Sequence, residues 1–195
     1  GNVLHNDNVK ALFGTGSDLQ IYHNSTSGNS HIDESGSGSL VVKATDLYLN
    51  SSTDEAMASF ISDGAVTLYH NNAAKIATTA TGVTVTGTAV ATTDTDTSNT
   101  CNVTLDFAAN QNFVLTLTGN TTLVNPSTEQ VGQSGFITLI QDGTGGRTLS
   151  LGTDYETAGG AGITLTSTAS ATDIVPYVVS AAGRILLGAP QLAFS

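Results

Sequence analysis

The sequence predicts an all-β protein in two parts, an elongated homotrimeric strand-and-turn shaft followed by a jelly-roll-like β-sandwich tip. The composition favours strands, because Gly, Ser, Thr, Asn and Val all have low helix propensity. Many short runs alternate apolar and polar residues, which is typical of strands with one buried face. One segment also recurs 47 positions later in the 195-residue chain, which indicates a repeated structural unit.

The recurring segment runs from Ala11 to Asn24 and again from Ala58 to Asn71. Each copy begins with Ala-x-Phe and, five residues later, continues as an alternating strand that ends in Tyr-His-Asn. A shorter version lies at residues 46–50. A unit of this size cannot bury its apolar face alone, so we expect the copies to stack on further copies.

Residues 1–90 contain too few large apolar side chains for a compact monomer. A domain of about 90 residues buries roughly 60–65% of its unfolded surface. Three chains around a common axis need only one or two apolar residues per layer from each chain, so we predict a homotrimeric shaft over residues 1–90. Leu40–Val42 and Leu47–Leu49 are two of the expected strands in this region.

Residues 91–101 are almost entirely Thr, Asp, Ser and Asn, and we interpret them as a linker. From residue 102 the apolar content rises, and residues 102–195 are predicted to form the β-sandwich tip. The Gly-rich residues 142–146 are predicted to close a hairpin. The strands expected here lie near residues 103–107, 113–117, 136–140, 147–151, 163–165, 174–179 and 184–187.

Charge and composition exclude several classes of partner and chemistry. The formal net charge is −11 with five Lys and Arg residues, which disfavours nucleic acid and anionic membranes. A single cysteine, Cys101, permits no internal disulfide and no cysteine-based metal site. The carboxylate pairs lie in turn-rich sequence without an aromatic sugar platform, so we expect neither an enzyme nor a bound cofactor.

Two histidines, His23 and His70, occupy equivalent positions of the repeat. A trimer would bring three copies of each to one axis, where neutral imidazoles can hold a transition metal. We expect instead a strand-end residue that is hydrogen-bonded to a loop, and the metal site remains the alternative.

Several motifs carry a resemblance to a known family. Phe13–His23 reads Phe-Gly-x-Gly-x-Asp-Leu-x-Ile-Tyr-His, and Phe60–Tyr69 with Thr78–Val83 follows a related pattern. Both halves resemble tail-fibre and related virion-fibre proteins of tailed phages, particularly phages of marine bacteria such as cyanobacteria. In the second half the similar pieces are Gln111–Phe113, Leu117–Asn120, Gly132–Gly135 and Gln141–Arg147.

The resemblance implies a homotrimer on the virion surface that contacts other virion proteins, with a slender N-terminal part and a globular C-terminal tip. The tip would attach to a host glycan or outer-membrane protein, and an anchoring segment would normally lie upstream. We expect receptor contacts in the longest polar loops, 142–146 and 154–162. The candidate residues are Asp142, Gly143, Thr144, Gly145, Gly146, Asp154, Tyr155 and Glu156.

Two other functions fit parts of the sequence. A capsid or tail appendage without a specific receptor would form the same trimer, and the sequence does not separate it from an attachment fibre. A secreted carbohydrate-binding adhesin module would be a monomer with a sugar site. The absence of Trp disfavours the adhesin module, because sugar-binding faces usually contain aromatic rings.

Overall fold

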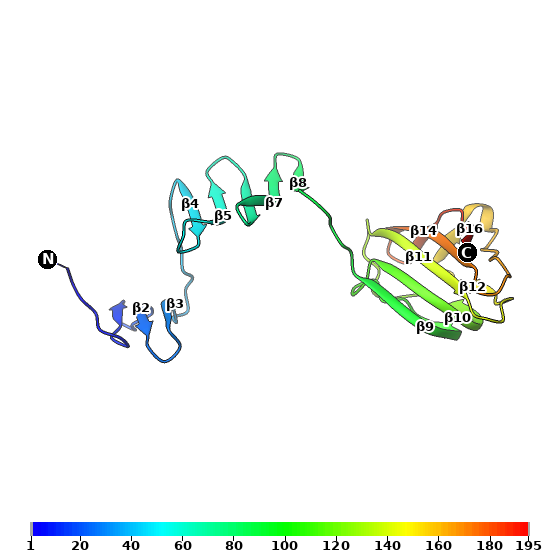
Figure 1. The fold of residues 1–195 in the computed structure, drawn as a ribbon, viewed down its shortest axis with the longest axis horizontal. Helices are drawn as coiled ribbons and strands as arrows, with labels where there is room; N and C mark the ends of the chain where they lie inside the picture. Colours follow the sequence, from blue (N-terminus) through cyan, green and yellow to red (C-terminus); the bar gives the residue numbers. More distant parts are fainter. Residues whose placement is uncertain (1, 195) are drawn as a thin grey trace. The chain divides into compact units, whose positions relative to one another are not determined.

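The computed structural model describes residues 2–194 and is all-β, as predicted (Figure 1). Strands make up 50% of the chain and helix only 2%. The chain divides into two compact units, Gly1–Gly87 and Thr88–Ser195. No helix in the described residues has the length and the apolar character that crossing a membrane requires.

The N-terminal unit contains two antiparallel sheets whose strands follow one another in sequence order. The first has three strands and the second has five, and hairpin turns join neighbouring strands. The strands are β1 (Ala11–Phe13), β2 (Leu19–Asn24), β3 (Asn29–Glu34), β4 (Asp46–Asn50), β5 (Ala56–Ile61), β6 (Val66–His70), β7 (Ala73–Thr79) and β8 (Gly82–Val85).

The two copies of the recurring segment form hairpins with the same register. In each, the Ala-x-Phe strand pairs antiparallel with the strand that ends in Tyr-His-Asn. The cross-strand pairs are Ala11–Ile21 and Phe13–Leu19 in β1–β2, and Ala58–Leu68 and Phe60–Val66 in β5–β6. The sequence identity therefore preserves which side chains share a face of the sheet.

One face of the five-stranded sheet is apolar and uncovered within its own unit. Phe60 is 39% exposed, Leu68 44% and Val83 62%, and Ala58 is the only hydrophobic residue described in this unit that is buried. The strand registers and the period of two place the following side chains on this face: Leu47, Leu49, Ala58, Phe60, Val66, Leu68, Ile76, Val83 and Val85. The prediction that this region has a thin core of its own is thus confirmed.

The opposite face of the same sheet is mixed in character, and two of its polar side chains are buried. Ser59 and Thr67 are 4% and 9% exposed, and the Ser59 hydroxyl lies 3.3 Å from the Tyr69 hydroxyl. The same face also exposes Tyr48 and Met57, at 59% and 50%. Apolar side chains therefore remain in solvent on both faces of this sheet.

The C-terminal unit is built from one mixed sheet of eight strands. They run in the order β12-β10-β11-β14-β15-β13, with β9 also pairing with β10 and β16 with β14. Their bounds are β9 (Thr93–Val103), β10 (Asn112–Leu123), β11 (Ser134–Gln141), β12 (Leu149–Leu151), β13 (Tyr155–Thr157), β14 (Thr172–Ala181), β15 (Arg184–Leu187) and β16 (Gln191–Phe194), and one 3-10 turn, η1, spans Ala158–Gly160.

The core of this unit follows from the alternation along its strands. Phe107, Phe113 and Tyr177 form an aromatic group, with Phe107 5.0 Å from Phe113 and 5.2 Å from Tyr177 between ring centroids. The Tyr177 hydroxyl donates to the Gln111 carbonyl at 2.6 Å, and burial raises the pKa of Tyr177 to about 12. The remaining core residues are Leu105, Leu115, Leu117, Leu123, Ile137, Leu139, Tyr155, Val175, Val179, Ile185 and Leu187.

The predicted linker over residues 91–101 is wrong, because most of it is β9. This strand runs parallel to β10 with two register shifts, and the boundary between units lies at Gly87 and Thr88 instead. Asn99, 1% exposed, donates its side-chain amide to the carbonyls of Asp96 and Thr116 at 3.1 Å. The polar composition of residues 91–101 gave no apolar alternation from which to predict a strand. An edge strand is held by its backbone hydrogen bonds and can carry polar side chains on both faces.

The predicted jelly-roll-like sandwich also differs from the structure. A jelly roll is antiparallel, whereas β9, β11 and β12 are all parallel to β10. The alternation of apolar residues identified the buried face correctly. It contains no information about which strands are neighbours or in which direction they run.

We expect Phe113→Ala to destabilise the C-terminal unit by about 3–5 kcal/mol, because it removes a fully buried ring from the aromatic group. Urea titration followed by hydrogen exchange of the β10 amides measures the change. Val131→Ala, at a position 66% exposed, is the control and should cost less than about 0.5 kcal/mol. Equal effects of the two substitutions would contradict the assignment of the core.

Candidate functional site

The Gly-rich residues 142–146 do not close a hairpin. β11 and β12 both pair with β10 in the parallel direction, at Phe113–Leu117 and at Thr121–Leu123. The chain leaves this edge where the Asp142 amide donates to the Leu117 carbonyl at 3.2 Å. It returns where the Thr121 amide donates to the Thr148 carbonyl at 2.9 Å. Residues 142–147 are thus a loop that leaves the edge of β10 after β11 and returns to the same edge at β12.

Gln141 closes the base of this excursion. Its side-chain amide donates to the Arg147 carbonyl at 2.9 Å, and its side-chain oxygen accepts from the Arg147 amide at 2.8 Å. Gln141 is 3% exposed, so both bonds are shielded from water. The Gln141 side chain therefore takes the place of a backbone amide and carbonyl pair, and it holds the two ends of the loop together.

Asp142 holds the interior of the loop. Its Oδ1 accepts from the amides of Thr144 and Gly145 at 3.0 and 2.9 Å, and its Oδ2 lies 2.7 Å from the Arg147 guanidinium. The Arg147 bond first, and then the Gly145 amide, lower the pKa of Asp142 from 3.8 to about 2. The carboxylate is therefore charged at any pH above that value and is occupied by partners of its own loop.

Gly145 packs against the neighbouring segment 167–171. Its φ is +75°, and an added Cβ would lie 2.5 Å from the Ser167 carbonyl oxygen, so only glycine fits. The Gly146 amide donates to the same carbonyl at 2.9 Å. Of the predicted contact residues in this loop, Thr144 alone has an exposed side chain that makes no side-chain bond. The loop is rigid and offers a partner mainly backbone.

Residues 154–162 differ more from the prediction. Tyr155 and Glu156 lie on β13, not in a loop, and Tyr155 is 5% exposed and belongs to the core. Burial raises the pKa of Tyr155. Tyr155 is therefore not a surface contact, because the parallel pairing of β13 with β15 directs this side chain inward.

Glu156 is already engaged on this surface through its carboxylate, and Asp154 is engaged through its backbone. Glu156 receives two bonds from the Arg184 guanidinium, at 2.8 and 3.0 Å, and this contact lowers the pKa of Glu156. The Asp154 carbonyl accepts from the Ile185 amide at 2.7 Å. The exposed part of the predicted loop is residues 158–162, where Gly159, Gly160 and Gly162 all have positive φ.

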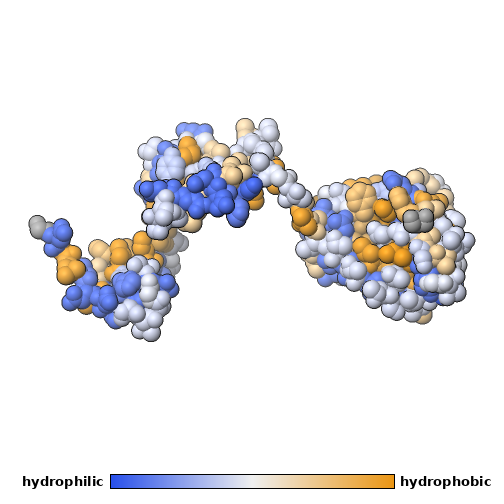
Figure 2. All heavy atoms as spheres, viewed as in Figure 1, coloured by the Kyte–Doolittle hydropathy of each residue, from blue (hydrophilic) through white to orange (hydrophobic). Residues whose placement is uncertain are grey.

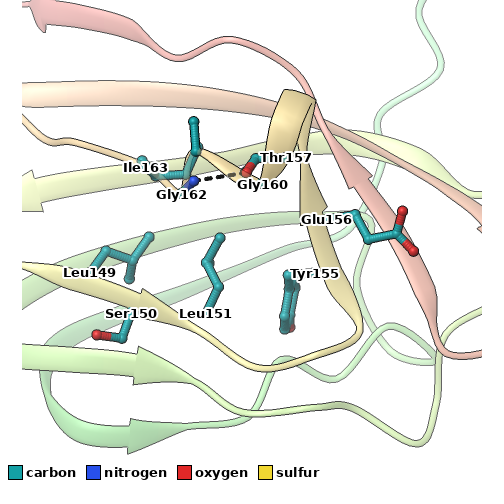
Figure 3. Close-up of a pocket in the computed structure, with 10 residues that line it drawn as sticks. Leu149, Ser150, Leu151, Tyr155, Glu156, Thr157, Gly160, Gly162 and Ile163 are labelled. Atoms are coloured by element: carbon teal, nitrogen blue, oxygen red, sulfur yellow. Dashed lines mark hydrogen bonds between the residues drawn. The ribbon is translucent and has the colours of Figure 1, made fainter.

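A cavity of about 700 Å³ lies between β12 and residues 160–163. Figure 3 shows Leu149 and Leu151 projecting from β12 toward this segment, with Glu156 pointing away from it. The volume is within the range of pockets that bind ligands. No sequence pattern indicates the cavity, because its walls come from two segments whose relative spacing only the sheet determines. The cavity is lined by Leu149, Ser150, Leu151, Tyr155, Glu156, Thr157, Gly160, Ala161, Gly162 and Ile163.

The two repeat histidines lie at the ends of β2 and β6 and are exposed. His23 Nδ1 is 3.1 Å from the Ser30 hydroxyl on β3. Their alternation places His23 with Ile21 and His70 with Leu68, on the apolar face of each sheet. Within residues 2–194 of one chain no three His, Cys, Asp or Glu side chains form a metal-binding group.

Residues 92–183 match a family model described as "Putative phage tail fibre C-terminal domain". The matched region begins one residue before β9 and extends almost to β15, so it spans most of the C-terminal unit. Searches of curated proteins and of solved structures found no match. The family match supports a phage tail-fibre protein, and with it a virion-associated structural protein.

The Asp142 contacts predict a pH dependence of stability. Its pKa is lower in the folded chain than in the unfolded one, so the contribution is complete above about pH 5 and is lost as the pH falls toward 2. Asp142→Asn should remove this part of the pH dependence of the thermal midpoint. Asp7→Asn, at an exposed position without a side-chain hydrogen bond, should leave the profile unchanged, and matching profiles for the two variants would contradict the assignment.

Proposed function

We propose that the chain is part of a homotrimeric phage fibre that attaches the virion to the host surface through its C-terminal unit. The observation that carries the proposal is the uncovered apolar face of the N-terminal sheets. Together with the family match of residues 92–183, it favours a fibre assembled from several copies. The proposed role is binding, without a catalytic step.

The apolar faces support self-association because they repeat. Phe13 and Ile21 on the first sheet are 50% and 43% exposed, and they correspond to Phe60 and Leu68 on the second. Contiguous exposed apolar surface of this kind normally marks an interface. Copies related by a symmetry axis would bury equivalent faces against each other, and three copies suit a slender axis with few side chains per layer.

The segment Leu40–Val42 supports the same assembly. The sequence predicts it as a strand, but within residues 2–194 it has no strand partner, and its three residues are 48%, 66% and 62% exposed. Such a run has high β propensity and costs free energy in water. A neighbouring copy could supply the strand partner or the apolar surface that the single chain lacks.

The C-terminal unit also has an apolar outer face. Phe136 and Val178 are 52% and 40% exposed, and Pro176 pairs with Phe136 between β14 and β11. Figure 2 shows hydrophobic residues on the exposed surface of this unit. This face is suited to contacts between copies, which would leave residues 143–146 and 158–162 free for a host receptor. Three loop sets on one particle would turn weak single contacts into useful avidity.

We expect light scattering to give three times the 19.8 kDa chain mass for the purified chain. Phe60→Asp should shift this mass to that of the monomer, because it places a charge on the proposed interface. Thr84→Asp, an exposed position on the opposite face of the same sheet, should keep the trimer. A monomer for the unmodified chain would reject the fibre assembly.

We expect the trimer to adsorb saturably to host cells. The double substitution Thr144→Arg and Ala158→Arg should reduce adsorption by at least about tenfold, since both side chains lie in the exposed loops. The double substitution Asn2→Arg and Asn6→Arg, at exposed positions of the N-terminal unit, adds the same charge and is the control. Unsaturable adsorption of the unmodified trimer would favour a purely structural appendage.

A further inference from the structure

The outer face of the C-terminal sheet, opposite the core, has no charged side chain on its three central strands β10, β11 and β14. The chain has 16 acidic residues and a net charge of −11, so an uncharged face of this extent is exceptional. The nearest charged pair on this side, Arg184 with Glu156, lies at the border on β15 and β13. The strand registers place the following side chains on the face: Asn112, Val114, Thr116, Ser134, Phe136, Thr138, Ile140, Thr172, Ile174, Pro176 and Val178.

A projecting aromatic side chain and an apolar recess adjoin on this face. Phe136 is 52% exposed, although its strand has partners on both edges. Pro176, directly across from it on β14, forms one wall of an open cavity of about 310 Å³. Phe136 is not among the residues that line this cavity, so the recess is not filled by its own chain. The recess is lined by Pro176, Tyr177, Val178, Leu186, Leu187 and Gly188.

The chemistry of the face favours a second copy of this chain as its partner. Identical copies each carry a net charge of −11, so their association is opposed least where no carboxylates meet. Each copy offers both the projecting ring of Phe136 and the recess that such a ring can fill. A contact between different patches of two copies is head-to-tail, and repeated contacts of this kind can close into a ring of subunits.

We propose that Phe136 of one copy inserts into the recess of the next copy, so that three C-terminal units join in a closed ring. The inference rests on the proposed trimeric fibre and names the surface through which its tips contact each other. The N-terminal faces hold the copies together. Only residues 86–92 separate β8 from β9, so the C-terminal units remain at a high effective concentration.

Fluorescence of a single tryptophan tests the proposal, because the chain has no Trp of its own. Phe136→Trp keeps an aromatic ring at the contact, and Thr144→Trp places the same probe in an exposed loop outside the face. Light scattering first gives the mass of each full-length variant. In the trimer we expect acrylamide to quench Phe136→Trp at least about threefold less than Thr144→Trp, since an interface core packs as densely as a protein interior.

A second substitution tests the recess itself. Val178→Asp, at a position 40% exposed, adds a charge to the recess lining. In the Phe136→Trp background it should raise quenching to the level of Thr144→Trp, because a charge opposes burial of the ring. The mass should stay that of the trimer, since the N-terminal faces are unchanged. Ser127→Asp, an exposed position outside the face, is the charge-matched control and should leave quenching unchanged.

The outcomes separate this proposal from the fibre assembly. Equal quenching of Phe136→Trp and Thr144→Trp in a trimer would overturn the proposed contact and leave the fibre assembly intact. Weak quenching of Phe136→Trp that Val178→Asp does not change would overturn it as well. A monomeric mass for the unmodified chain would instead reject the fibre assembly, and the ring of C-terminal units with it.

Discussion

The pairing of β10 with three parallel strands is the constraint on which the C-terminal unit depends. β9 occupies one edge of β10, and β11 and β12 divide the other between them. Parallel neighbours cannot be joined by tight hairpins, so each connection must be an excursion that leaves the sheet and returns. The loop at residues 142–147, its closure by Gln141 and the internal bonds of Asp142 are consequences of that requirement.

The same division of one edge between two strands creates the open part of the sheet. β11 lies between β10 and β14 and is paired on both edges, whereas β12 is short and pairs with β10. Residues 163–165 keep the side-chain alternation of a strand, because the core still fixes Ile163 and Leu165. Burial and hydrogen bonding, which usually coincide in a sheet, are therefore separated at this site.

In the N-terminal unit the pairing of the strands is not matched by burial of their side chains. Neighbouring strands of the five-stranded sheet are hydrogen-bonded to each other, while the apolar side chains of one face remain in water. Burying a side chain of this size contributes about 1.5–3 kcal/mol, so the uncovered face is a large unused source of stability. Association of identical copies would bury this face, and each copy would contribute the same residues to the interface. The equal registers of the two hairpins therefore matter for the proposed fibre.

Local sequence determined the strand character of most segments and which residues face inward, because alternation and β propensity are properties of neighbouring residues. It also determined the hairpins of the N-terminal unit, where antiparallel partners are adjacent in the chain. It failed at β9, whose polar side chains conceal a backbone-held edge strand, and at Tyr155, whose burial depends on pairing with β15. Strand direction, the enclosed core and the opening between β12 and residues 160–163 were decided by the tertiary structure, since they depend on contacts between segments far apart in sequence.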